Sequence, residues 1–154
     1  MKWRNHKLCT VCIVFAATGR LLPSFIAGLG SILPDVLEAG FVRHRTLTHW
    51  PFVYVALILT IVPAIKHVSW WAWLVVGCLL IGCILHLAQD ALSKGGIPLF
   101  NPAGKKYGLG CYVTDTISET FVFTGIVLVA LYVAGQRGFL STNFLAEEIR
   151  WLFS

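Results

Sequence analysis

The stretch TGRLLP, residues 18–23, decides how the first part of this chain folds. Apolar segments lie on both sides of it, at residues 8–19 and 21–33. One straight helix through both would hold Arg20 at its middle, where a bare guanidinium costs about 3 kcal/mol or more in a bilayer. Gly19 and Pro23 are turn residues, so they favour a hairpin of two short helices. A hairpin puts His6 and Asp35 on one side of the membrane, whereas a single helix separates them by about 40 Å.

The composition requires a lipid environment. The chain has 154 residues, of which 57% are hydrophobic and 12% are charged, and its mean hydropathy is +0.78. A soluble domain has a charged fraction of about 25%. This chain is therefore predicted to be an integral membrane protein with one domain over residues 1–154, divided into membrane helices (1–136) and a tail (137–154).

Three further apolar segments follow the first two, at residues 50–65, 70–87 and 117–134. Each is near the length needed to cross about 30 Å of hydrocarbon. The tail places Phe144, Leu145, Ile149 and Leu152 at helical spacing, which is typical of an interfacial amphipathic helix. The predicted fold is all-α and polytopic. It has an N-terminal helical hairpin or one long helix, three transmembrane helices, and a C-terminal amphipathic helix that anchors in lipid or binds a protein partner or a second copy.

The charge distribution argues against a nucleic-acid partner. The net charge is +5, with 12 basic and 7 acidic residues, but the basic residues flank apolar segments, as the positive-inside rule describes.

Cys9 and Cys12 form a CxxC with no second CxxC, so a zinc ribbon is unsupported. Eight of the 12 basic residues fall on the side of the candidate site if the hairpin is right, and this predicts a site that faces the cytoplasm.

The link SILPDVLEAGFVRHRTLTHWP, residues 31–51, holds most of the polar chemistry. With a hairpin and alternating helices, one face collects a set of imidazoles and carboxylates: Asp35, His44, His49, His86, Asp90 and His6. These groups are the usual ligands of zinc and related divalent metals. Each alone could be structural, but ionisable groups near the ends of membrane helices are expensive and tend to be functional. Together they predict a metal site.

Basic and hydroxyl side chains surround this set. Arg43 and Arg45 suit an anionic substrate, because a guanidinium binds phosphate or carboxylate bidentately; the alternative is that they only follow the positive-inside bias. Thr48 could hydrogen-bond a metal ligand. Lys94 and Lys105, in a Gly- and Pro-rich loop, could attract an anionic headgroup.

The ordered motifs LPD, HRTLTH, HLAQD and GGIPLFNP resemble the YdjM-like family of inner-membrane, metal-dependent hydrolases. The resemblance runs from about His6 to Glu119 and implies a bacterial inner-membrane location. There is one departure, because Leu37 stands where the family has a second aspartate. Either the neighbouring Glu38 takes over that ligand, or the site holds fewer metal ions than other members do.

These observations predict a membrane-embedded hydrolase that acts on a phosphoester of a lipid or isoprenoid, with one to three divalent ions, zinc being favoured. A metal lowers the pKa of bound water and polarises a phosphoryl oxygen. Arg45, helped by Arg43 or Lys94, would stabilise the developing charge, and Thr48, Glu38 or Glu119 would assist catalysis, the two glutamates by positioning water. Glu119 could instead only favour the start of the last helix. The alternatives are a metal or proton transporter and a membrane adaptor with a structural metal.

Overall fold

The computed structural model describes residues 1–38, 46–141 and 143–153. Its elements are the helices α1 (Trp3–Thr18), α2 (Leu21–Gly30), α3 (Leu33–Glu38), η1 (Leu47–His49), α4 (Pro51–Lys66), α5 (Trp70–Ala91), α6 (Ile117–Gln136) and α7 (Phe144–Leu152), and the strands β1 (Ile97–Pro98) and β2 (Lys106–Tyr107). The two short strands pair antiparallel. The protein is thus all-α apart from this small hairpin, as the sequence predicts.

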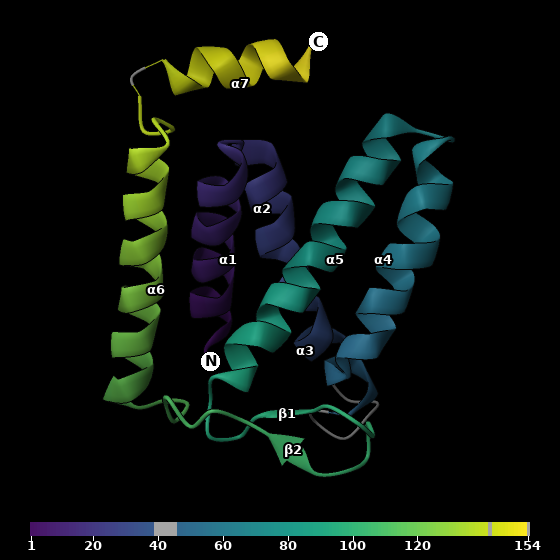
Figure 1. The fold of residues 1–154 in the computed structure, drawn as a ribbon, viewed down its shortest axis with the longest axis vertical. Helices are drawn as coiled ribbons and strands as arrows, with labels where there is room; N and C mark the ends of the chain where they lie inside the picture. The colour runs from purple at the N-terminus through teal and green to yellow at the C-terminus, as the bar shows by residue number, and fades with distance from the viewer. Residues whose placement is uncertain (39–45, 142, 154) are drawn as a thin grey trace.

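The first two helices form the predicted hairpin. Gly19 adopts a left-handed conformation with φ 66°, and its N–H bonds the carbonyl of Phe15 at the end of α1. Arg20 is extended, and the chain then reverses into α2. A Cβ atom at Gly19 would lie 2.8 Å from the ring of Phe139, so glycine suits both the backbone and the packing. The start of α1 and the end of α3 consequently lie at the same end of the molecule (Figure 1).

Among the described residues, three helical segments are long and apolar enough to cross a membrane: Leu21–Glu38, Trp70–Ala91 and Ile117–Gln136. The first joins α2 and α3 into a run of 18 residues, which is longer than the short helix predicted at 21–33. Conversely, α4 has 16 residues, so it spans about 24 Å and falls short of a full crossing. The apolar segment predicted at residues 50–65 is thus a helix of the predicted length, shifted by one residue, and it is shorter than the three candidate spans.

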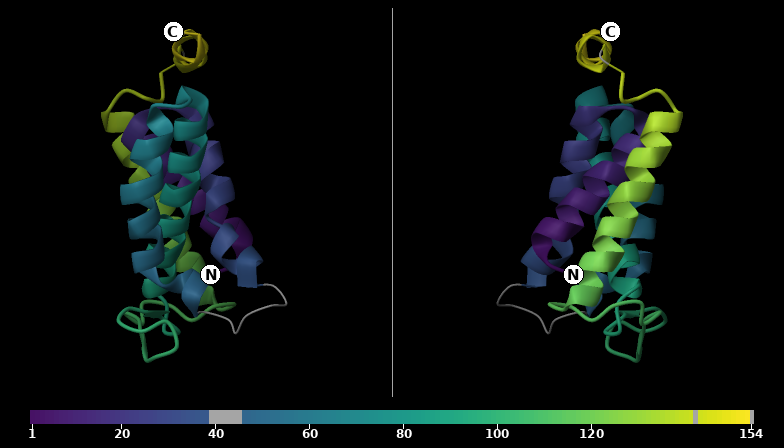
Figure 2. Two further views of the ribbon diagram at one scale, coloured as in Figure 1. Left: turned by 90° about the vertical axis from the view of Figure 1, so that its right-hand side faces the viewer. Right: turned by 90° about the vertical axis from the view of Figure 1, so that its left-hand side faces the viewer.

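Helix α5 packs against α2 on one side and α4 on the other, while α1 lies between α2 and α6 (Figures 1 and 2). Glycines allow α2 and α5 to approach closely. A Cβ atom at Gly30 would lie 2.2 Å from the carbonyl oxygen of Leu79, and one at Gly82 would lie 2.0 Å from that of Ala27. The crossing of these two helices therefore depends on backbone contact, and it sets where α3 lies relative to the end of α5.

The tail forms helix α7, which lies across the end of the bundle opposite the N-terminus (Figure 1). The buried carboxylate of Glu148 accepts a hydrogen bond of 2.9 Å from the backbone N–H of Leu22, so it caps α2. The indole of Trp151 lies 5.2 Å from the guanidinium of Arg20 and 5.7 Å from the ring of Trp70. The predicted tail helix thus packs on the hairpin turn of its own chain.

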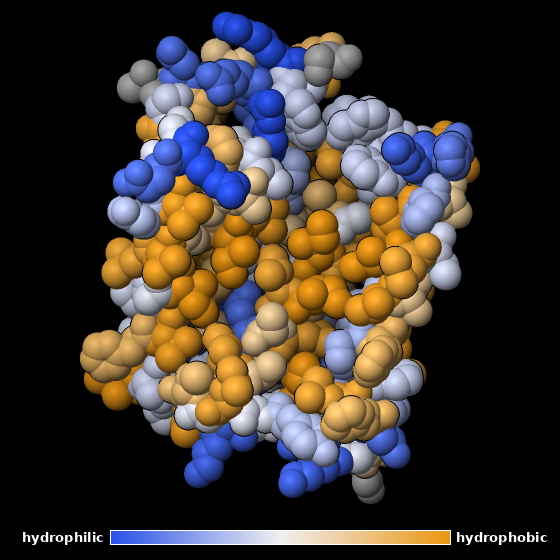
Figure 3. All heavy atoms as spheres, in the orientation of Figure 1, coloured by the Kyte–Doolittle hydropathy of each residue, from blue (hydrophilic) through white to orange (hydrophobic). Residues whose placement is uncertain are grey.

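The outer surface of the bundle is apolar across its middle. In Figure 3 hydrophobic residues form a broad belt, and hydrophilic residues gather at its two ends. Leu59, Phe121 and Val129 are each more than 60% exposed on α4 and α6. Apolar surface of this extent needs lipid cover, as in a membrane protein.

Candidate metal centre

Imidazole and carboxylate side chains from four helices meet at the N-terminal end of the bundle. His6 lies in α1, Asp35 in α3 and His49 in η1, and α5 supplies His86 and Asp90 from its last turns. The spacing of four residues puts His86 and Asp90 on the same face of α5. The structure therefore brings together five of the six predicted metal ligands.

Asp35, His49 and His86 surround one point, and Asp90 lies beside the two imidazoles. The Nε2 atom of His49 lies 3.2 Å from Nε2 of His86 and 3.3 Å from Oδ1 of Asp35. Nε2 of His86 lies 3.6 Å from the same Asp35 oxygen. Oδ2 of Asp90 lies 3.7 Å from His49 Nε2 and 3.8 Å from His86 Nε2. Tetrahedral zinc with bonds of about 2.0–2.1 Å has ligand atoms about 3.3–3.4 Å apart, and the atoms of Asp35, His49 and His86 come near this spacing. Asp90 shares His86 with a separate group of candidate ligands.

Unsatisfied buried atoms support the same interpretation. Asp35 Oδ1 and His6 Nε2 face the candidate ligands, are buried, and make no hydrogen bond within the described part of the chain. Asp35 Oδ1 makes none even though His49 Nε2 is 3.3 Å away. Buried polar atoms normally have a partner, and a cation between oxygen and nitrogen lone pairs supplies one.

Hydrogen bonds made by Nδ1, the ring nitrogen on the side away from the candidate metal, orient two of the histidines. A carboxylate oxygen only accepts, so His49 Nδ1 donates to Glu38 Oε1 over 3.0 Å. This leaves the lone pair of His49 on Nε2, the nitrogen that faces Asp35 and His86. Glu38 also accepts from the N–H of Thr46 and from the hydroxyl of Thr48. Ligating histidines in metalloproteins are commonly oriented in this way by an outer carboxylate.

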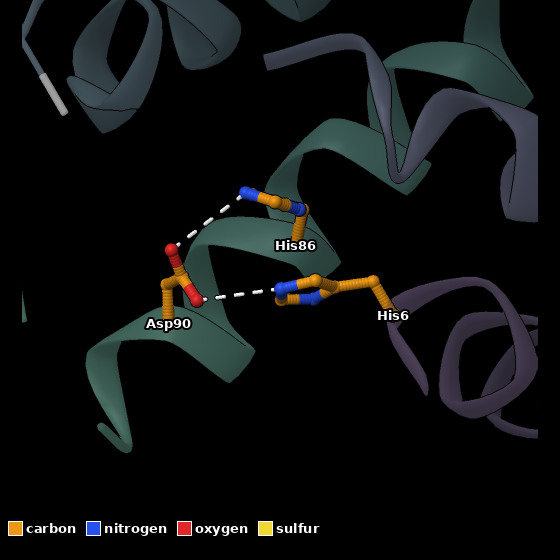
Figure 4. Close-up of side chains that lie close together, drawn as sticks. All are labelled: His6, His86 and Asp90. Atoms are coloured by element: carbon orange, nitrogen blue, oxygen red, sulfur yellow. Dashed lines mark ion pairs between the residues drawn. The ribbon is translucent and has the colours of Figure 1, made fainter. Parts of the chain in front are cut away.

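The second oriented histidine is His6. The Gln89 amide donates from Nε2 to Thr10 Oγ1 over 3.0 Å, which leaves its Oε1 to accept from His6 Nδ1, also over 3.0 Å. His6 Nε2 then faces Asp90 Oδ1 at 3.3 Å. In Figure 4 one carboxylate oxygen of Asp90 faces His6 and the other faces His86. His6, His86 and Asp90 form a second group whose ligand atoms lie within 4.8 Å of one another.

The Gly- and Pro-rich loop secures the end of α5 on which this geometry depends. The hydroxyl of Tyr112 donates to the carbonyl of Gln89 over 3.0 Å, Ser93 Oγ donates to that of Asp90 over 2.7 Å, and the N–H of Leu109 donates to that of Ala91 over 2.8 Å. The last carbonyls of a helix have no partner within it, so the loop supplies them. Gly96, with φ 60°, permits the close approach that this requires, because a Cβ there would lie 2.3 Å from the Tyr107 backbone.

Other predicted site residues lie outside the two ligand groups. Glu38 accepts a hydrogen bond from His49 Nδ1, on the side of the ring away from Asp35 and His86, and belongs to neither group. Glu119 accepts from the backbone of Lys2 over 2.7 Å, the Asn5 amide over 2.7 Å and the backbone of Asp115 over 2.9 Å. It therefore joins the start of α1 to α6.

The predicted cations lie around the centre or outside the described residues. Lys94 is exposed, and Lys105 lies 5.7 Å from the Tyr107 ring beside a groove of about 470 Å³ that Lys106 also lines. The Lys2 ammonium, 2.9 Å from Asp115, lowers the pKa of that exposed carboxyl through its hydrogen bond. Arg43, His44 and Arg45 lie outside the described residues.

Sequence reasoning missed Gln89 and Thr10. The sequence spacing could have pointed to both, since Thr10 is four residues after His6 and Gln89 is three residues after His86. Such spacing places each on the same helix face as a ligand. Neither residue is ionisable, and this is why neither stands out from the sequence.

The fold and this centre define an all-α inner-membrane protein with buried histidine and aspartate groups that could hold a metal ion. The chain belongs to the YdjM inner membrane protein family, whose sequence model matches residues 1–147. No curated protein and no solved structure matches the chain.

Proposed function

We propose that the protein is a metal-dependent hydrolase that acts on a phosphoester of a lipid or isoprenoid at the membrane surface, with zinc as the favoured metal. The observation that carries this proposal is the cluster of His49, His86, Asp35 and Asp90, in which the two imidazole Nε2 atoms lie 3.2 Å apart and each carboxylate has an oxygen 3.3–3.8 Å from both. A divalent ion bound there would activate water and polarise a phosphoryl oxygen.

Other features of the chain would orient a ligand, give reactants access to the metal and exclude bulk water. Glu38 holds His49 so that Nε2 faces the cluster. Reactants approach past Asp35, whose side chain is 12% exposed, while the side chains of His49 and His86 have no exposed surface. The buried surroundings exclude bulk water, which strengthens electrostatic interactions between the site and an anionic substrate.

The charge at this end of the bundle supports an anionic substrate and a cytoplasmic orientation. Described basic residues at the metal end are Lys2, Arg4, Lys7, Lys94, Lys105 and Lys106, whereas the opposite end has Arg20, Lys66, Arg137 and Arg150. The positive-inside rule then assigns the metal end to the cytoplasm. Lysines beside apolar side chains in the groove near Tyr107 suit the headgroup and first carbons of a lipid. Arg43 and Arg45 remain predicted to bind the phosphoryl group.

The test measures metal content and phosphoester turnover of the purified protein in detergent or nanodiscs. Wild type should retain a divalent metal and hydrolyse members of a panel of phosphatidic acid, phospholipids and isoprenyl phosphates. The double variant His49→Ala/His86→Ala should lose both properties, and His67→Ala, on the exposed turn at the opposite end, should retain them. Unchanged metal occupancy in the double variant would reject the metal site. Bound metal without phosphoester hydrolysis would favour an adaptor. Metal-dependent ion uptake into liposomes would favour a transporter.

A further inference from the structure

We propose that Asp90 bridges two divalent cations: a first ion held with Asp35, His49 and His86, and a second ion whose distinguishing ligand is His6. The inference rests on the metal centre of the proposed function and specifies its nuclearity. It concerns binding alone, so it stands or falls independently of which reaction the protein catalyses.

The two oxygens of Asp90 serve different partners. Oδ2 lies 3.7 Å from His49 Nε2 and 3.8 Å from His86 Nε2, beside the group formed by Asp35, His49 and His86. Oδ1 lies 3.3 Å from His6 Nε2 and 3.2 Å from the Met1 ammonium. Figure 4 shows the carboxylate between the two imidazoles, with one oxygen directed to each. An ionised carboxylate can accept a cation at each oxygen, and sites with two metals commonly share such a group.

His6 has the properties of a ligand and not of a packed histidine. It is fully buried, and its Nδ1 is engaged by Gln89. Its Nε2 makes no hydrogen bond within the described residues although Asp90 Oδ1 is 3.3 Å away. The Met1 ammonium, 3.2 Å from Asp90 Oδ1, already gives that oxygen a positive partner, whereas buried His6 Nε2 has none among these residues. A second cation contacting both atoms gives His6 Nε2 that partner.

Thr10, Gln89 and His6 are linked by hydrogen bonds, so the second metal position has its own orienting residues. Thr10 and Gln89 are buried, and together they set which nitrogen of His6 carries the lone pair. Glu38 does the same for His49 at the first position. Two separately oriented histidines on opposite sides of one carboxylate are expected for two ions, because a single ion needs only one of the two Asp90 oxygens.

Cobalt provides a spectroscopic probe of this arrangement. Purified full-length protein is stripped with a chelator, titrated with Co²⁺, and assayed for bound metal by mass spectrometry and for spin state by electron paramagnetic resonance. We expect saturation at two ions per chain. The high-spin signal of the first ion should decrease as the second binds, because a shared carboxylate couples the two spins.

Matched variants assign the second ion. His6→Gln should bind one ion with an uncoupled signal, whereas His67→Gln should still bind two. Gln89→Leu leaves every ligand in place and should weaken only the second ion, by roughly 10–100-fold; it provides the test if His6→Gln does not fold. Wild type that saturates at one ion, or His6→Gln that still binds two coupled ions, would overturn the inference. If the protein binds two ions but hydrolyses no phosphoester, only the hydrolase proposal is rejected. If it binds one ion and does hydrolyse a phosphoester, only the bridging role of Asp90 is rejected.

Discussion

Glu38 Oε1 lies 3.0 Å from His49 Nδ1, so the glutamate supports a candidate ligand from behind it. The two residues come from different helices, α3 and η1, and this buried contact joins the two helices beside the metal centre. This relationship explains how a chain with Leu37 in place of an aspartate can still use the acidic residue next to it.

Replacing Glu38 should weaken metal binding without removing a ligand. Glu38→Ala leaves His49 Nδ1 without its acceptor, and we expect a loss of 10–100-fold in affinity, the usual effect of removing such a partner. Competition with a chromogenic chelator measures the dissociation constant. Glu38→Gln, which keeps an acceptor oxygen, should lose less than Glu38→Ala. The exposed Glu147 on α7 provides the control, since Glu147→Ala should bind metal as wild type does. Equal affinity for all of these proteins would remove Glu38 from the centre.

Gly82→Ala should destabilise the crossing of α2 and α5. The added Cβ would lie 2.0 Å from the carbonyl oxygen of Ala27, and overpacking of this kind costs about 1–3 kcal/mol. Alanine also favours a helix by about 1 kcal/mol over glycine, so the matched control is Gly77→Ala on the same helix, where nothing lies within 4 Å. Thermal unfolding in detergent should show a lower midpoint for Gly82→Ala and an equal or higher one for Gly77→Ala. The same midpoint for both variants would contradict the close approach.

Tyr112→Phe should loosen the end of α5. The buried hydroxyl donates to the Gln89 carbonyl, and loss of one such hydrogen bond costs about 1 kcal/mol. Hydrogen exchange of the last turn of α5 should become faster, and metal affinity should fall because this turn positions Asp90. Tyr132→Phe is the control, since Tyr132 is 68% exposed on α6. If exchange in α5 is unchanged by Tyr112→Phe, the loop does not secure this turn.

Glu148→Ala should release α7 from the bundle and leave the metal centre intact. The buried carboxylate caps the start of α2 through Leu22, and loss of such a cap costs about 1 kcal/mol. Limited proteolysis should then cut the tail faster, while metal content stays at the wild-type level because α7 lies at the opposite end (Figure 1). Glu147→Ala, which changes the neighbouring exposed carboxylate, should be cut at the wild-type rate. Lost metal in Glu148→Ala would show that the two ends are coupled.

Apolar content and turn chemistry made the architecture predictable. The membrane class, the all-α fold, the YdjM-like family and the tail helix were all confirmed, and the hairpin followed from Gly19 and Pro23 beside Arg20. The length of the second span was harder, since the sequence does not show that α3 extends α2. Helix boundaries depend on local caps and on tertiary contacts, which hydropathy does not report.

The sequence by itself determined which side chains are candidate metal ligands, because residue type and hydropathy place imidazoles and carboxylates near helix ends. Only the tertiary structure decided between the hairpin and the single helix, and with it which candidates meet and what each one contacts. Glu38 and Glu119 are both acidic residues near helix ends, yet one contacts His49 and the other contacts the backbone of Lys2. Gln89 and Thr10 became visible only through their contacts with His6 and with each other. The reason is physical: a ligand's role depends on distances of a few ångströms between helices, and helix packing, not residue type, sets those distances.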